Sequence, residues 1–200
     1  MRPVKKRGLM SQERIRSFIA VDLDDTNIRN RIVNTQQGLE HTRASLKIVE
    51  PGIMHLTLRF LGEIPQSTVE KVKEAMNQLQ FHPFEVEFSG LGVFPNIRRI
   101  SVVWVGIIQG AEQLNDIFHQ LEPKLRQLGL PADDKGFSPH MTIARVRSGM
   151  NKEALAKYVE EMKGQEFGRM PVNSVRLKKS TLTPKGPIYT TIHETKAQAL

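Results

Sequence analysis

Two pairs of strand-forming segments in this sequence are joined by connections too short for a crossover. Residues 85–88, with an extension to 93, and residues 100–108 are separated only by a short turn. Residues 172–183 and 188–193 are joined in the same way. Parallel neighbours need a connection of about a dozen residues or more, so these strands are expected to pair as antiparallel hairpins. The sequence therefore predicts antiparallel sheets.

Helical patterns alternate with these strands. Residues 67–80 combine capping-box spacing between Ser67 and Glu70 with apolar side chains on one face, which predicts a helix. A second amphipathic pattern covers residues 112–128, where Pro123 is expected to kink or split the helix. Two further helices are expected at residues 27–45 and after Asn151, and further strands at residues 16–23, 46–49, 55–61 and 140–147. Together these patterns predict an α+β fold made of lobes in which helices cover one face of an antiparallel sheet.

The length of 200 residues allows one domain or two small packed lobes. No linker divides the chain, so we expect a single bilobed domain over residues 15–196, preceded by a flexible basic tail at residues 1–14. No apolar run reaches the roughly 20 residues of a membrane span, and no apolar core follows the basic start as a secretory signal requires. The absence of cysteine excludes disulfides, thiolate metal sites and a thiol nucleophile, and it suits the reducing cytoplasm, where we expect the protein.

The charge balance indicates the class of partner. Lysine and arginine number 29 against 21 acidic residues, a net charge of +8, which attracts polyanions at long range. A Lys/Arg-rich solvated surface without a docking role is an equally good interpretation of the charge alone. Because only 6% of the residues are aromatic, a long base-stacking platform for single strands is not expected.

One short pattern, His-X-Thr-X, occurs twice. It is His55-Leu56-Thr57-Leu58 in the first half of the chain and HMTI at residues 140–143 in the second. A single copy carries little information, because histidine and threonine are common. Two copies, each opening a strand after a proline-containing turn and lying about half a chain apart, indicate a duplicated half-site.

Strand geometry predicts where these side chains point. Residues i and i+2 share a face, so His55 projects with Thr57, and His140 projects with Thr142. If the two strands turn these faces to a common groove, two imidazoles and two hydroxyls converge on one small volume.

The same alternation assigns the neighbouring residues. Leu56, Leu58 and Phe60 are expected to point oppositely, into apolar packing. Arg59 shares the parity of His55 but lies about 13 Å along the strand, so we expect it at the groove edge or on the surface. Arg145 has the wrong parity for the His140 face unless a bulge intervenes.

Such a site suits the hydrolysis of a cyclic phosphodiester. The reaction needs a base to activate water and an acid to protonate the leaving ribose oxygen, and histidine can serve as either near neutral pH. The hydroxyls of Thr57 and Thr142 can donate hydrogen bonds to the non-bridging phosphate oxygens. No metal ion is needed, because hydroxyls, imidazolium and an arginine can stabilise the charge at phosphorus.

Three segments make the sequence similar to a known family. FIAVDL near the start, HLTLRFLGE at residues 55–63 and FSPHMTIAR at residues 137–145 resemble the 2H phosphoesterases, and specifically the RNA 2′,3′-cyclic phosphodiesterases, also called 2′-5′ RNA ligases. The resemblance covers nearly all of residues 16–194. It implies a bilobed fold of two antiparallel sheets with helices on the outer faces, related by a pseudo-twofold axis around a central cleft.

The resemblance also implies an activity. It is the hydrolysis of a 2′,3′-cyclic phosphate at an RNA end to a 2′-phosphomonoester, with His55 as proton donor, His140 as proton acceptor and Arg145 as a phosphate ligand. Some members of the family also join tRNA halves through a 2′-5′ linkage. We therefore expect a monomeric RNA-processing enzyme without cofactor or metal, whose partner is RNA with a cyclic phosphate end and not a membrane.

Two other functions remain open at this point. One is an RNA- or nucleotide-binding module of the same fold without turnover; the intact pair of motifs argues against it. The other is a metal-dependent hydrolase, which would need an aspartate such as Asp133 or Asp134 beside the histidines, although a turn role is the commoner one for such a pair.

Phe137 is expected either to stack a base or to anchor its loop. The basic segments 176–179 and Arg98-Arg99 are expected either to track RNA or to be solvated, and His41, His82, His119 and His193 are expected on the surface or on helix faces.

Overall fold

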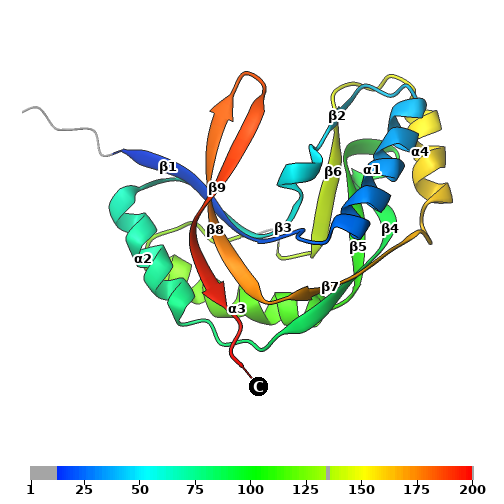
Figure 1. The fold of residues 1–200 in the computed structure, drawn as a ribbon. Coiled ribbons are helices and arrows are strands. Elements are labelled where there is room, and N and C mark those ends of the chain that lie inside the picture. The colour runs from blue at the N-terminus through cyan, green and yellow to red at the C-terminus, as the bar shows by residue number, and fades with distance from the viewer. Residues whose placement is uncertain (1–12, 134–135, 200) are drawn as a thin grey trace, which may run out of the picture.

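The computed structural model describes residues 13–133 and 136–199. The strands are β1 (Arg14–Asp22), β2 (Leu46–Ile48), β3 (His55–Pro65), β4 (Phe84–Asn96), β5 (Arg99–Gln109), β6 (His140–Val146), β7 (Glu166–Val172), β8 (Ser174–Thr183) and β9 (Gly186–Lys196). The helices are α1 (Thr26–His41), α2 (Gln66–Asn77), α3 (Ala111–Gln127) and α4 (Lys152–Glu161), with a 3₁₀ turn, η1 (Pro51–Ile53), before β3. Within the described residues, four helices are interspersed among the strands, and β4–β5 and β7–β8–β9 follow one another without a helix between them (Figure 1).

The strands form two sheets in which every pairing is antiparallel. One sheet has the order β3-β1-β8-β9 and the other the order β2-β6-β5-β4-β7. Each sheet contains one of the two motif strands, β3 in the first and β6 in the second, and these two strands contact each other. The predicted α+β class and the antiparallel pairing are confirmed.

The helices gather in two pairs away from this contact. α2 and α3 pack together against the four-stranded sheet, and α1 and α4 pack together against the five-stranded sheet (Figure 1). Apolar side chains such as Ile19, Leu121 and Ile143 are fully buried in the core. The motif faces of β3 and β6 are therefore left free of helices, which is the arrangement that a site between the lobes requires.

Two expectations about the helices are revised by the structure. α2 begins at Gln66 with Pro65 before it, and no side chain caps its N-terminus, so Ser67 is not a cap. Pro123 lies inside α3 without splitting it, because proline removes one main-chain hydrogen bond while the helix stays fixed through buried side chains, Leu121 and Leu125 among them.

β7 is a strand that the sequence pattern did not indicate. Gly168 and Pro171 interrupt its sequence, and both weaken a strand prediction. The structure accommodates them because β7 is an edge strand that pairs only with β4.

The chain starts its first strand at Arg14, the last residue of the predicted tail, and residues 1–12 lie outside the described part. No helix within the described ranges has the length and the apolar content that crossing a membrane requires.

Candidate active site

The two motif histidines occupy equivalent places and make equivalent hydrogen bonds. Each is the first residue of its strand, His55 of β3 and His140 of β6. The Nδ1 atom of His55 lies 2.7 Å from the carbonyl oxygen of Ile53, and that of His140 lies 2.7 Å from the carbonyl oxygen of Ser138. A carbonyl oxygen only accepts, so Nδ1 carries the hydrogen in both rings. In the neutral form of each ring, Nε2 is thus the nitrogen that carries no hydrogen and can accept one.

Aromatic side chains form a corner around each imidazole. Phe18 and Tyr189 lie beside His55, with ring centroids 4.8 and 5.3 Å away. Phe94 and Trp104 lie beside His140, at 4.8 and 6.0 Å. The first corner comes from β1 and β9, at opposite ends of the chain, and the second from the β4–β5 hairpin.

Burial in these corners lowers the pKa of both histidines from the usual 6.5. The carbonyl of Ile53 opposes this effect at His55, as the carbonyl of Ser138 does at His140, because each favours the protonated ring. Both rings therefore favour the neutral form in the substrate-free protein, with Nε2 available to accept a proton.

The two threonines lie on the histidine faces of their strands. Thr57 and Thr142 are half-buried, each between two buried neighbours. Neither hydroxyl has a hydrogen-bond partner among residues 13–133 and 136–199, so both hydroxyls can donate to a bound ligand.

A β-bulge follows each threonine. In the β1–β3 ladder Leu58 has no partner, and in the β5–β6 ladder Ile143 has none. An unpaired residue reverses the parity of the residues beyond it. The two bulges therefore return Phe60 and Arg145, each five residues after its histidine, to the histidine face.

The bulges settle where Arg145 lies. Its guanidinium is exposed, and its charge lowers the pKa of both histidines, although burial has the larger effect on each. The positive charge of Arg145 is therefore felt at both imidazoles. Its cross-strand neighbour on β2 is Lys47, which is exposed as well.

Two predictions for the first motif are wrong because the bulge at Leu58 reverses the faces of the residues that follow it. Phe60 does not pack in the core, since 58% of its surface is exposed. Arg59 is not a surface charge: its exposed fraction is 8%, and its Nε lies 2.7 Å from Oε2 of Glu122. The guanidinium also donates to the carbonyl oxygens of Phe60 and Pro131, so it fastens α3 and the following loop to β3.

The other candidate residues divide between structural and surface positions. Phe137 stacks on Phe118 with centroids 5.1 Å apart, which confirms the loop-anchoring role. Arg98 and Arg99 are exposed at the tip of the β4–β5 hairpin. His41, His82 and His119 are exposed, as predicted, and His193 contacts Asn77.

Acidic residues do not complete a metal site at the motifs. Within the described ranges there is no group of three or more histidine, aspartate or glutamate side chains that is arranged to hold a metal ion. Asp133 is described, and its backbone N–H donates to Glu122, whereas Asp134 lies outside the described residues.

Sequence patterns missed the aromatic corners, because the corners depend on strand register. The residue that best marks the corner around His140 is Gly92, because a Cβ atom there would lie 2.1 Å from the ring of Trp104. The indole therefore lies flat over Gly92, and only glycine leaves room for it beside His140.

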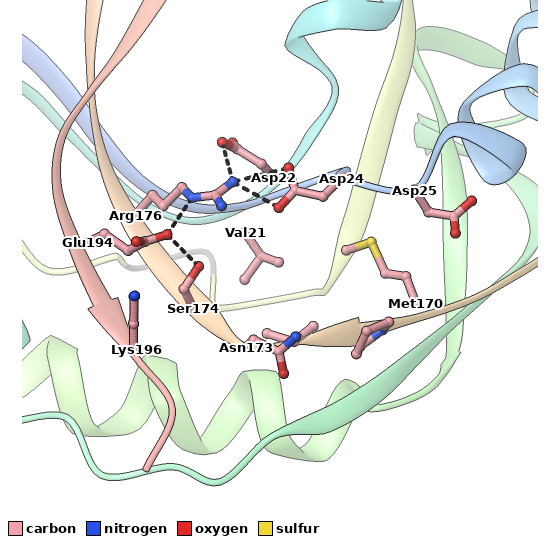
Figure 2. Close-up of a pocket in the computed structure, with 12 residues that line it drawn as sticks. Val21, Asp22, Asp24, Asp25, Met170, Asn173, Ser174, Arg176, Glu194 and Lys196 are labelled. Atoms are coloured by element: carbon pink, nitrogen blue, oxygen red, sulfur yellow. Dashed lines mark hydrogen bonds and ion pairs between the residues drawn. The ribbon is translucent and has the colours of Figure 1, made fainter. Parts of the chain in front are cut away.

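A separate pocket of about 520 Å³ lies where the sheets join through the β7–β8 connection (Figure 2). It contains neither motif histidine. Its wall includes Asp22, the cross-strand neighbour of His55, together with Arg176 and Glu194.

Known proteins resemble the chain over both halves. A family model described as LigT like Phosphoesterase matches twice, at residues 21–104 and 105–189, with one motif in each match. The chain is 39% identical to the RNA 2′,3′-cyclic phosphodiesterase of Aeropyrum pernix over 84% of this chain and 95% of that protein. It is also 39% identical to the protein of the same name from Archaeoglobus fulgidus, over 88% and 96%.

Solved structures share the fold. A Thermus thermophilus protein, 29% identical, superposes with a TM-score of 0.77 over 91% of this chain and 97% of that one. E. coli LigT complexed with 3′-AMP, 22% identical, gives a TM-score of 0.78 over 94% and 100%. The second likeness establishes the arrangement of the two sheets and four helices.

Proposed function

Because the chain belongs to the LigT-like phosphoesterase family of the 2H superfamily, we propose that it is an RNA 2′,3′-cyclic phosphodiesterase that forms 2′-phosphomonoester ends. The observation that carries the proposal is the duplicated half-site. Each of the two imidazoles donates Nδ1–H to a carbonyl oxygen, and two residues after each histidine is a threonine whose hydroxyl has no partner among the described residues. Two proton-transfer groups beside two donors fit the chemistry of a cyclic phosphate.

In the proposed reaction, Nε2 of His140 accepts a proton from water as the water oxygen attacks phosphorus. The bond between phosphorus and O3′ breaks, and Nε2 of His55 donates its proton to O3′. The phosphate remains on O2′. Exchange of protons with solvent then returns both histidines to their starting states.

The remaining polar groups stabilise charge on the phosphate. The hydroxyls of Thr57 and Thr142 donate to the non-bridging oxygens, and the exposed guanidinium of Arg145 offsets their negative charge. Because the Nδ1 hydrogen bonds fix the orientation of each ring, the groups need little rearrangement when the charge develops. No step requires a metal ion.

The same geometry supports 2′-5′ ligation. If the 5′-hydroxyl of a second RNA takes the place of water, the identical transfer of two protons forms a 2′-5′ phosphodiester and releases O3′. Such a second RNA could be the 3′ half of a cleaved tRNA. We propose hydrolysis as the principal reaction, because water is always in excess over RNA 5′ ends.

Longer RNA is held by the basic surface. Arg145 and Lys47 are adjacent at one edge of the motif face, and Arg98 and Arg99 lie on a hairpin of the same sheet. The exposed ring of Phe60 on the opposite lobe offers an apolar face to a base.

Product analysis tests the proposal. A short RNA ending in a 2′,3′-cyclic phosphate is incubated with the protein and EDTA, and the products are resolved from synthetic 2′- and 3′-phosphate standards. We expect the 2′-phosphate alone. Binding without turnover would favour the non-catalytic module, and activity restored only by added Zn²⁺ or Mn²⁺ would favour the metal-dependent hydrolase.

A further inference from the structure

An aspartate lies directly across the ladder from one motif histidine. In the β1–β3 register, Asp22 is the partner of His55. Opposed residues of an antiparallel pair share a face of the sheet, with Cβ atoms about 4.5–5.5 Å apart. Asp22 and His55 therefore project from the same face of the sheet, the face that carries the motif, and the carboxylate is close enough to act electrostatically on the imidazole.

Two basic side chains of β8 fix this carboxylate. Its Oδ2 atom accepts a hydrogen bond of 2.9 Å from Arg176 and one of 2.6 Å from Nζ of Lys178. Arg176 is held in turn by Glu194 and Asp24 (Figure 2). Both bonds end on the same oxygen, and Oδ1 of Asp22 has no partner in the described part of the chain.

The second histidine lacks such a neighbour. The residue across the ladder from His140 is Gly106, which has no side chain. The charged group that acts on His140 is Arg145, which disfavours its protonated form. The two half-sites are therefore alike in hydrogen bonding and unlike in electrostatics.

The charged groups that act on His55 come from three strands. Asp22 on β1 favours the imidazolium, while Lys178 on β8 and Arg145 on β6 disfavour it. Burial lowers the pKa of His55 more strongly than any of these charges. Without Asp22, both the burial and the two remaining charges would oppose protonation of His55.

We propose that Asp22 is a positioning residue that lets His55, and not His140, hold the proton for the leaving group, and that Arg176 and Lys178 fix its carboxylate for this purpose. The inference rests on the proposed function and concerns the same site. An anion beside an imidazole stabilises the charged ring, whereas Arg145 disfavours the charged form of both rings, so the half-site with Asp22 becomes the acid and the half-site without it becomes the base. If the ion pairs of Asp22 with β8 had only a structural role, replacing Asp22 would not change the titration midpoint of His55.

Titration of the histidine ring protons by NMR tests the proposal without any need for turnover. In Asp22→Asn, we expect the midpoint of His55 to move to lower pH while that of His140 stays in place. Lys178→Met should move the midpoint of His55 in the opposite direction. Each unit by which the midpoint falls reduces the protonated fraction about tenfold at a pH well above it.

Asp24→Asn is the matched control. Asp24 binds the same guanidinium of Arg176, but its side chain is 69% exposed and it is not the ladder partner of His55. An unchanged midpoint of His55 in Asp22→Asn, or an equal shift in Asp24→Asn, would overturn the proposal. If Asp22→Asn fails to fold, the double variant Asp22→Asn/Lys178→Met, which leaves neither of these two charges unpaired, decides: its His55 midpoint should lie below that of Lys178→Met.

The pH profile of turnover supplies the second readout. In Asp22→Asn the alkaline limb of kcat should move to lower pH, because that limb reports loss of the acid, whereas the acidic limb should remain. Shifted histidine midpoints in a protein without phosphodiesterase activity would refute the proposed function and leave the electrostatic role of Asp22 standing. Normal turnover with unmoved histidine midpoints would refute the electrostatic role of Asp22 and leave the proposed function standing.

Discussion

Methionine substitutions at Arg59 and Arg145 should separate a structural arginine from a functional one. Each arginine follows one copy of the motif, and strand alternation alone places Arg59, not Arg145, on the histidine face. The structure reverses these assignments: the guanidinium of Arg59 is buried against Glu122, whereas that of Arg145 is exposed on the histidine face. We expect Arg59→Met to lose stability with little loss of activity, and Arg145→Met to lose activity with little loss of stability.

The size of each effect follows from the contacts. Removing one partner of a buried ion pair costs about 3–5 kcal/mol. Glu122 keeps a hydrogen bond from the backbone of Asp133 and is 15% exposed, so we expect Arg59→Met to cost about 3 kcal/mol, the low end of the range. For a chain of this length, that lowers Tm by about 6–12 °C. Arg145→Met should change stability by no more than about 0.5 kcal/mol and reduce kcat by about 100- to 1,000-fold, as the loss of one charge-stabilising donor does.

Thermal unfolding and turnover of a cyclic mononucleotide are measured on the same preparations of each variant. The first measurement checks the predicted loss of stability, and the second checks the predicted loss of activity. Activity is measured at least 15 °C below the Tm of each variant, so that unfolding does not count as lost catalysis. If Arg59→Met folded normally and lost its activity, Arg59 would belong to the site and the bulge argument would be wrong. A normal rate for Arg145→Met would remove Arg145 from the phosphate ligands.

The remaining predictions concern the histidines, pH and salt. His55→Ala and His140→Ala should each lower kcat by about 100- to 10,000-fold while Tm changes little, and near-normal rates in either variant would exclude its role. Since burial lowers the pKa of both histidines, and the active form holds one proton between them, kcat/KM for a cyclic mononucleotide should be highest below pH 6.5; an optimum well above that value would contradict the lowered pKa values. Affinity for longer RNA should fall steeply with salt while mononucleotide turnover falls much less, and equal salt slopes would show that the +8 charge is not a docking surface.

The strand starts and their pairing were predictable because hydrophobic alternation and short turns are local signals. The bulges were not. Leu58 and Ile143 look like ordinary core residues of a strand, and nothing beside them in sequence marks the loss of a ladder partner. Since one unpaired residue reverses all later positions, the assignments of Arg59 and Phe60 failed together and that of Arg145 stayed open until the register was known.

The surroundings of the histidines were beyond sequence reasoning for a different reason. Phe18 and Tyr189 are far apart in the chain and meet at His55 only because β1 pairs with both β3 and β8, and β8 pairs with β9. Asp22 likewise reads as the polar end of a strand until the β1–β3 register places it opposite His55. The motifs predicted which groups could transfer protons, whereas strand register determines which side chains surround them.

The differences between the two half-sites bear on how a substrate must lie. Both halves have a histidine on a carbonyl oxygen and a bulge after the threonine, but the residue returned to the site is Phe60 in one half and Arg145 in the other. If Arg145 attracts the phosphate and Phe60 stacks a base, as we propose, a nucleotide has one favourable orientation between the lobes. That orientation sets which ribose oxygen approaches which imidazole. We infer that duplication supplied two interchangeable proton carriers, and that the unequal residues at Phe60, Arg145 and Asp22 made one of them the acid and the other the base.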